Sequence, residues 1–372
     1  MRISLTGLLF LSLFCSAQRD STLSLQSLDL PSSPAFILLD QTPSCIERPS
    51  NGKAFVLGIV NSLVDNQGIP KNYSVELTPF WYFKHPKLNA LKYMGYDKKK
   101  GKQQVFNGLR MTSLSAAYLQ SQDTATQYRV DNFSFGLRST IFTVKSKKDI
   151  DAIIQANRMH IKYLRSLHEL MEERNINDSL LEANKKEYKR KLTQLLEERV
   201  NDSIFTKNVF PELLSRKPVF SVSIALAYNT FFTTGSYDSS HFGRMGGWIT
   251  MNYSKPLNKE NGGNYINIYA VGRYLSDGTA RMLGEYFTQQ LLDLGWKFEL
   301  EFRKLAISYE YLYRKSDIAE TYRSSGNVRF RISDQLMLNG TFGKNFGHEQ
   351  NLITLLGLQW GLSTGNEKVG LN

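Results

Sequence analysis

The sequence predicts an all-β protein: a transmembrane antiparallel β-barrel of about 12 strands, with a two-helix hairpin insertion and an irregular, plug-like N-terminal segment. From residue 53 onward, large apolar side chains recur at every second position, most clearly in Leu292–Phe302. This period of two places alternate side chains on opposite faces of a strand. The chain also begins with an export signal, and strands with one apolar and one polar face behind such a signal are typical of outer-membrane barrels.

The export signal occupies residues 1–17. A positive charge at Arg2 precedes an apolar run, Leu8–Phe14, and the small residues before Gln18 suit cleavage after Ala17. The run is too short to anchor the chain in a membrane, and no later segment is long and apolar enough for a transmembrane helix. We therefore expect secretion followed by insertion into the outer membrane as a multi-pass barrel, in contact with its lipid.

The net charge of +12 could indicate a nucleic-acid ligand. Exported chains do not normally meet nucleic acid, and no recognition motif is present, so we exclude that partner. The basic run Lys98–Lys102 is interpreted as a solvated loop, with anionic head groups or an acidic partner as the alternative.

Twelve segments alternate between apolar and polar residues and are assigned as strands. Residues 18–52 form an N-terminal tail and plug-like segment, 53–146 hold the first barrel strands, 147–201 the helical hairpin, and 202–372 the remaining strands. The expected strands are 53–64, 72–84, 105–119, 130–145, 219–233, 243–255, 264–275, 286–302, 304–314, 322–332, 335–344 and 351–362.

Turn lengths predict which connections share one end of the barrel. The two tightest turns, Arg303-Lys304 and Ser333-Asp334, are separated by two strands and therefore lie on the same side. Short turns and both chain termini are periplasmic in bacterial barrels. Counting strands in pairs then places the 147–201 insertion in the periplasm as well.

Within 147–201 the apolar period changes from two to about 3.5, beginning with Ile150, Ile154 and Asn157. This spacing is the stripe of a helix that packs against another helix. A capping box at Ser179–Glu182 begins a second helix. The insertion is therefore predicted to be a helical hairpin that projects from the barrel.

Four prolines interrupt the segment Pro31–Pro49, which argues against regular helix or central strand. Its apolar residues still need cover, which the barrel mouth or lumen would supply. The candidate plug residues are Pro34, Phe36, Leu38, Pro43, Ile46, Arg48 and Pro49.

The pattern P-S-S-P-A-F-x-L-L…P-S-x-I-x-R-P at 31–49, followed by Pro79–Trp81, resembles a group of exported barrel proteins from Bacteroidota. Most members of that group have no assigned activity. The resemblance covers roughly the first quarter of the chain and implies an outer-membrane barrel without naming a substrate.

Strand parity points several charged side chains into the lumen, where they would form cross-strand ion pairs or a charged constriction. The candidate lumen charges are Glu299, Glu301, Glu310, Arg314, Arg329 and Arg331. The sequence shows no cofactor motif, no metal-ligand spacing and no catalytic motif beyond the weak constellation Ser239–His241.

Two main functions follow from these observations. A long helical arm favours a structural, assembly or partner-binding role in the cell envelope, with protein partners bound through the 147–201 hairpin. The alternative is a passive pore or transporter for small solutes. A phospholipase-like hydrolase that uses Ser239–His241 is a remote third possibility, and we expect no enzyme activity.

Overall fold

The computed structural model describes residues 22–25, 33–40, 44–46, 54–60, 72–83, 85, 88, 90–97, 99–122, 129–159, 190, 213, 216–233, 237–258, 263–282, 285–333, 336–347, 351–361 and 367–370. Most of the predicted hairpin at 147–201, the export signal and parts of the N-terminal segment lie outside these residues.

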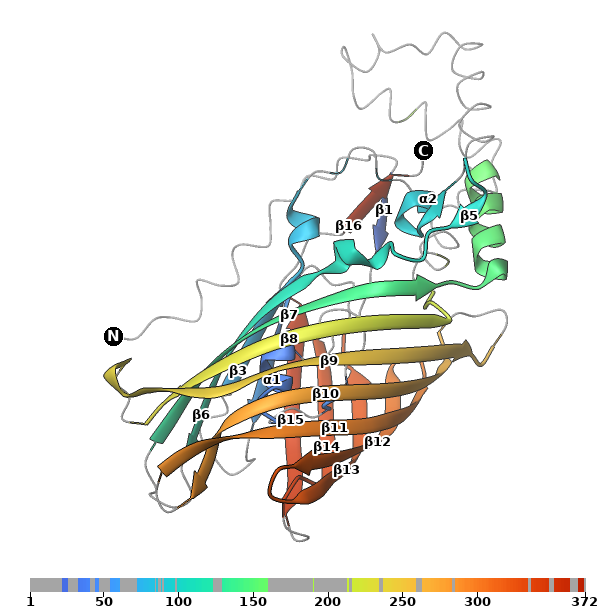
Figure 1. Cartoon of the computed structure of the whole chain (residues 1–372). Helices are drawn as coiled ribbons and strands as arrows, with labels where there is room; N and C mark the ends of the chain where they lie inside the picture. Colours follow the sequence, from blue (N-terminus) through green and yellow to red (C-terminus); the bar gives the residue numbers. More distant parts are fainter. Residues whose placement is uncertain are drawn as a thin grey trace, which may run out of the picture.

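Twelve antiparallel strands close into a barrel in the order β10-β11-β12-β13-β14-β15-β2-β3-β6-β7-β8-β9 (Figure 1). The seam pairs β15 with β2, the last and first barrel strands, through Leu356↔Val60 to Gly361↔Phe55. The strands are β2 (Ala54–Val60), β3 (Asn72–Leu77), β6 (Ser113–Gln122), β7 (Arg129–Val144), β8 (Phe220–Phe232), β9 (Ser240–Pro256), β10 (Tyr265–Met282), β11 (Glu285–Glu301), β12 (Leu305–Ser316), β13 (Glu320–Arg331), β14 (Leu336–Lys344) and β15 (Leu352–Gly361). The predicted fold class and strand number are confirmed.

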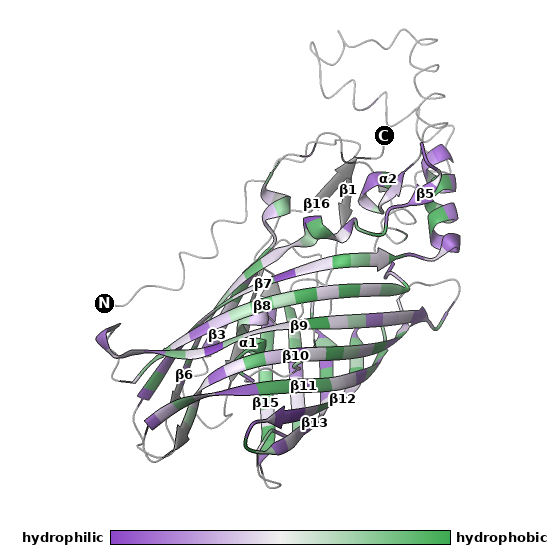
Figure 2. Ribbon diagram, viewed as in Figure 1, coloured by the Kyte–Doolittle hydropathy of each residue, from purple (hydrophilic) through white to green (hydrophobic). Residues whose placement is uncertain are grey.

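The barrel has polar side chains inside and apolar side chains outside. Along β11, Leu294 and Trp296 are about half exposed, whereas the intervening Asp293, Lys297 and Glu299 are almost fully buried. Figure 2 shows the same alternation as bands of opposite hydropathy along β9–β13. An apolar outer surface around a polar interior suits strands that face lipid and enclose a lumen.

β10 extends to Met282, beyond its predicted end at residue 275. Two other predicted strands are shortened by 3-10 turns. β3 ends at Leu77, and Pro79 begins a 3-10 turn, η3 (Pro79–Tyr82), because proline cannot donate to a strand ladder. The strand expected at 105–119 begins only at Ser113. Before it, Val105 O accepts a hydrogen bond from Thr143 N at 2.9 Å, beside the end of β7, and residues 108–111 form a second 3-10 turn, η4 (Gly108–Met111).

We call the end of the barrel where β2 begins and β15 ends the near end. The strand order places the turns at Arg303-Lys304 and Ser333 and the start of the 147–201 insertion at this end, so the predicted parity is confirmed. Outside the barrel, β1 (Thr22–Leu25) pairs with β16 (Glu367–Gly370). Figure 1 shows this pair beyond the near end, beside α2 (Ala90–Tyr93).

A near-end subdomain packs around its own small apolar core. It contains α2, a short hairpin of β4 (Tyr96–Asp97) and β5 (Lys102–Gln103), and a helix over residues 147–159. Lys99 and Lys100 are exposed in that hairpin, as expected for a solvated loop. The buried core residues are Leu91, Tyr93, Met94, Ile153, Ala156 and Leu213.

The described part of the predicted helical insertion starts with a side-chain cap. Ser146 Oγ accepts from Asp149 N at 3.1 Å and donates to Asp149 Oδ2 at 2.5 Å. Such reciprocal bonds satisfy donors at a helix N-terminus. Asn157 is buried on the packing side, and the helix packs against the α2 region. Among the described residues, no helix is both long and apolar enough to cross a membrane.

Candidate functional site

The described N-terminal residues Ser33–Asp40 and Ser44–Ile46, which we call the plug, lie inside the barrel, where Figure 1 shows α1 (Pro34–Ile37) enclosed by the strands. Pro34 stands in the first turn of this one-turn helix, where its missing N–H costs nothing. Phe36 N and Ile37 N donate to Ser33 O at 2.9 and 3.0 Å. The expectation that the prolines forbid helix is therefore wrong at Pro34.

One side of the plug makes apolar contacts with β6 and β15. Phe36 is fully buried and belongs to a cluster that the barrel completes with Ala117, Leu119, Ile353 and Leu355. Ala35 N also lies 3.3 Å from Ser115 Oγ, a hydrogen-bond acceptor on β6.

The backbone of β7 approaches the plug at Gly136. A Cβ atom placed on Gly136 would lie 2.6 Å from Ser115 Oγ of the barrel wall, and within the plug 2.7 Å from Pro34 Cβ and 2.8 Å from Ala35 N. All three distances are shorter than real Cβ contacts, so only glycine fits while the plug is seated.

The other side of the plug meets a mixed apolar and charged wall. Ile37, Leu38, Cys45 and Ile46 are buried in a second cluster. The barrel residues of that cluster are Ala225, Ala227, Trp248, Tyr269, Val271, Leu275, Leu291, Leu312 and Phe346.

Asp40 of the plug is held by arginines of the barrel. Asp40 Oδ1 lies 2.7 Å from Arg273 Nη2, and Asp40 Oδ2 lies 3.0 Å from Arg244 Nη1 and 2.9 Å from Arg314 Nη2. Arg323 Nη1 donates to Asp40 O at 3.4 Å. We call Arg244, Arg273, Arg314 and Arg323, which come from β9, β10, β12 and β13, the arginine cluster.

The plug backbone takes part in the same network, since Ile37 O accepts from Arg273 Nη1 at 2.9 Å and Leu38 O accepts from Arg244 Nη1 at 3.2 Å. Burial by itself would raise the pKa of Asp40, but the attraction of Arg314, Arg273 and Arg244 outweighs it and holds that pKa well below its usual range. The plug therefore presents a carboxylate, not a carboxylic acid, to the arginines.

Glu310 holds the second part of the plug. Its carboxylate accepts from Cys45 N at 3.0 Å, Ile46 N at 3.2 Å and Ser44 Oγ at 2.6 Å. Lys297 Nζ donates to Ser44 Oγ at 2.8 Å. Desolvation raises the pKa of the Cys45 thiol to about 12, so this buried thiol stays protonated and unreactive.

The predicted lumen charges all stand on inward-facing positions. Glu299 pairs with Arg329 at 2.6 Å, Glu301 pairs with Lys217, and Arg314 bonds Asp293 as well as the plug. Glu310 bonds the plug backbone, and Arg331 lies at the near-end rim. The cross-strand ion pairs are therefore present.

Of the candidate plug residues, Pro34, Phe36, Leu38 and Ile46 lie buried in the lumen. Pro43, Arg48 and Pro49 lie outside the described residues. The sequence interpretation missed Asp40, Arg244, Arg273 and Arg323. Strand parity marks the three arginines as inward, but only the closed barrel brings them to one carboxylate.

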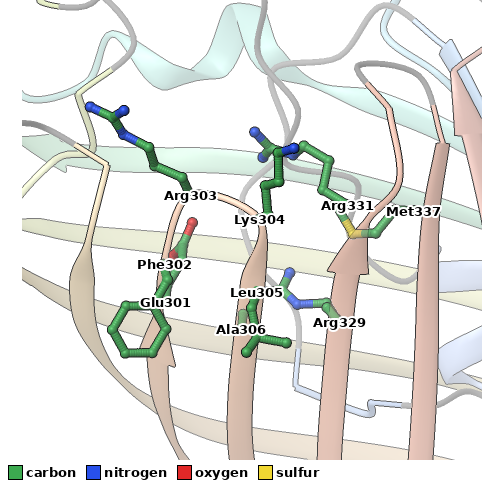
Figure 3. Close-up of a pocket in the computed structure, with 9 residues that line it drawn as sticks. All are labelled: Glu301, Phe302, Arg303, Lys304, Leu305, Ala306, Arg329, Arg331 and Met337. Carbon is green, nitrogen blue, oxygen red and sulfur yellow. The ribbon is translucent and has the colours of Figure 1, made fainter.

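A small, open pocket lies at the near-end rim, between the β11–β12 turn and the end of β13. Figure 3 shows Arg303, Lys304 and Arg331 extending beyond the strand ends, away from Phe302 and Leu305. This rim therefore presents positive charge at the near-end mouth of the lumen.

The other groups that could carry chemistry, Ser239–His241 and possible metal ligands, form no site among the described residues. The His241 ring stacks on Phe231, with centroids 5.4 Å apart, and makes a tilted contact with Tyr286 at 5.3 Å. No group of three or more possible metal ligands occurs in the part of the chain that the structure describes. The hydrolase hypothesis stays a prediction without further support.

The inward polar and outward apolar faces decide the class of this protein. Its fold is that of an outer-membrane β-barrel. No family model matches the chain, and no curated protein matches it.

Several solved structures are similar to this chain. They include a KdgM porin in complex with disordered oligogalacturonate (TM-score 0.29, 6% identity, 68% of this chain and 94% of that one). A NanC porin has a TM-score of 0.27 and 5% identity over 67% of this chain and 90% of its own. Outer-membrane expressed OmpT of Vibrio cholerae has a TM-score of 0.28 and 5% identity, over 82% of this chain and 94% of its own.

Proposed function

We propose that the protein is an outer-membrane pore for small solutes whose lumen is closed by its own N-terminal plug. The observation that carries this proposal is the charged wall around the plug. A segment buried only for stability would be held as well by apolar side chains, because buried ion pairs are poor stabilisers relative to good apolar packing. Here the plug is seated against four arginines and Glu310 instead.

The size of the barrel supports the same function. Barrels of about 8 strands fill their interior with side chains, and barrels of about 16 strands enclose an aqueous channel. A barrel of 12 strands lies between them. The plug occupies the middle of this interior, and its removal would leave a lumen lined by polar and charged groups.

The plug is also separable from the barrel sheet. It contributes no strand to the barrel, and its described contacts are side-chain packing, ion pairs and hydrogen bonds. Its departure would therefore break no strand ladder.

The close approach at Gly136 provides a test that leaves the plug sequence intact. Gly136→Leu would place a side chain where Pro34 and Ala35 now lie, and overpacking of this kind costs about 1–3 kcal/mol. We expect larger single-channel conductance in planar bilayers and faster maleimide labelling of Cys45.

The matched control is Gly340→Leu on β14, where a Cβ would meet nothing within 4 Å. It should keep the conductance and Cys45 labelling of the original chain. If Gly136→Leu folds, exposes Cys45 and still passes no current, the pore proposal fails.

Binding of a protein partner is the second candidate, and the near-end subdomain favours it. The helix at 147–159 is fixed by its cap and by the Leu91–Met94 core, so the 147–201 insertion begins from an ordered base. Affinity purification from detergent extracts tests this role. Co-purifying proteins that are lost when residues 147–201 are deleted would support it.

Three expectations from the sequence also belong to this proposal. The exposed apolar side chains of the strands would contact outer-membrane lipid. Membership of the Bacteroidota group stays a prediction that rests on the 31–49 motif.

The near end would face the periplasm. Trypsin added to intact cells tests that orientation, because cleavage near residues 185–191 would place this end outside.

A further inference from the structure

The donors that hold Asp40 belong to the barrel, and only the carboxylate belongs to the plug. Arg244, Arg273 and Arg314 reach it from three different strands, at 3.0, 2.7 and 2.9 Å. The interaction is therefore a carboxylate-binding site built by the lumen wall and occupied by a side chain of the same molecule.

We propose that the arginine cluster is the binding site for a carboxylate-bearing solute, which opens the lumen by taking the place of Asp40. This inference rests on the proposed pore function and names the class of solute that such a pore would admit.

The site stays assembled without Asp40, because wall groups orient its arginines. Arg273 Nε and Arg314 Nε bond the two oxygens of Asp293, each at 2.7 Å. Arg244 Nη2 pairs with Asp277 at 2.9 Å. A solute would therefore meet guanidinium groups already held in place, which lowers the cost of binding.

Arg314 has a further support, since its guanidinium carbon lies 3.6 Å from the centre of the Phe346 ring. Planar guanidinium groups suit carboxylates because their donors match the two oxygens, as the Arg314–Asp293 pair shows. The second carboxylate, Asp40, is bound differently, by one nitrogen from each of Arg244, Arg273 and Arg314.

The charge balance of the lumen wall favours an anion. Besides the four arginines, Lys297 lies beside Glu310 and bonds Ser44. These five cations face three wall carboxylates, Asp277, Asp293 and Glu310, so the wall has two positive charges in excess (5 − 3 = 2). Asp40 neutralises one of them. A carboxylate-bearing solute in its place would do the same, whereas an uncharged solute would leave the excess uncompensated in a buried site.

Cys45 is a built-in reporter of plug position. It is buried, hydrogen-bonded through its backbone to Glu310, and close in sequence to Asp40. In the full-length protein carrying Cys15→Ser, maleimide labelling of Cys45 in detergent would report release of the plug.

The experiment compares sodium D-glucuronate with D-glucose, inorganic phosphate and sodium chloride, with the salts at matched ionic strength. We expect glucuronate to accelerate labelling at least about 10-fold, and glucose and chloride to leave it unchanged. No acceleration by glucuronate, or equal acceleration by chloride, would overturn the inference. Acceleration by phosphate as large as that by glucuronate would overturn the preference for a carboxylate.

Asp40→Asn provides a second test in the same protein. The variant should label quickly without solute and gain little from glucuronate, because its plug no longer competes for the arginines. Asp97→Asn, at a partly buried position at the end of β4 and outside the barrel, should behave as the original chain. If Asp40→Asn keeps its heat-modifiable gel mobility yet labels as slowly as the original chain, Asp40 is not the group that holds the plug.

The selectivity of Gly136→Leu separates this inference from the pore proposal. Current that favours chloride and glucuronate over potassium supports both. A cation-selective current would support the pore proposal and contradict the carboxylate-site inference. If Gly136→Leu passes no current although glucuronate still exposes Cys45 in the original chain, the carboxylate-site inference stands and the pore proposal fails.

Discussion

The lumen and the near-end subdomain each hold a desolvated charged side chain, the buried Asp40 and the partly buried Lys145, but neighbouring groups compensate the two charges differently. Asp40 lies within 3.0 Å of three arginines. Lys145, just after β7, donates from Nζ to Arg216 O at 3.0 Å. Desolvation lowers the pKa of Lys145 to about 8, and although Asp149 counteracts this shift, the positive charge of Arg110 adds to it.

The pKa values of Asp40 and Lys145 respond differently because of the number and sign of the neighbouring charges, not because of burial alone. Asp40 stays ionised throughout the neutral range, so pH should not control plug seating there. Lys145 loses its proton at mildly alkaline pH. The lumen should therefore respond to competing anions and the near-end subdomain to pH.

The largest effect on plug release is expected from Arg273→Met. This substitution removes an arginine that bonds Asp40 and Ile37 O of the plug as well as Asp293 of the wall. Loss of one partner from a buried ion-pair network costs about 3–5 kcal/mol. Maleimide labelling of Cys45 should rise by on the order of 100-fold or more. Arg303→Met, at the rim, is the control and should label slowly; equal labelling of both variants would contradict the role of Arg273.

Phe36→Ala tests the apolar side of the same plug. Removal of this fully buried ring should cost about 3 kcal/mol of plug binding, because the ring fills an apolar cluster with Ala117, Leu119, Ile353 and Leu355. Cys45 labelling should rise without any change in its response to pH. Phe106→Ala, which removes an exposed ring in the near-end subdomain, should have no effect on labelling.

Lys145→Met tests the near-end half of the comparison. Because the folded-state pKa is about 8 and the ordinary value 10.5, the unfolded chain binds the proton more tightly between these pH values. Stability therefore rises with pH across that window, and the destabilisation is complete below pH 8.

Urea unfolding in detergent measures the effect. Lys145→Met should have a higher free energy of unfolding than the original chain, and this advantage should be larger at pH 7.5 than at pH 10. Lys99→Met, on an exposed side chain, should show no such change between the two pH values. A pH-independent difference for Lys145→Met would show that its ammonium is well solvated.

The smallest effect is expected from Asp149→Ala. It removes the partner of Ser146 in the helix cap and the 2.9 Å ion pair with Arg216, at a cost of about 1 kcal/mol. Loss of its negative charge should also lower the pKa of Lys145 further and extend the pH-dependent window below 8. Asp151→Ala, exposed on the same helix, provides the control in the urea titration.

Most of the barrel could be predicted from the sequence because each strand has one face toward the apolar exterior. The alternation around Trp296 specified which residues point inward, and Glu299 and Arg329 lie where it placed them. The pattern failed at Val105, where apolar residues alternate over a short stretch but bond to the end of β7 at Thr143. Local alternation carries no information about which strand, if any, a segment pairs with.

The carboxylate site could be predicted only in part. The plug was expected from prolines and apolar residues that need cover, and Phe36 and Ile46 are indeed enclosed. The association of Asp40 with Arg244 and Arg273, more than 200 positions away in the chain, depends on register and closure of the whole barrel. No local pattern encodes such a contact.

The pairing of β1 with β16 means that the plug has a tether on each side. β1 precedes it and β2 follows it, and both are joined to strands at the C-terminal end of the chain. A displaced plug therefore stays attached as a loop, and its return is an intramolecular step at high effective concentration. The barrel would close again by itself once the solute has passed, without a second protein or an energy source to reset it.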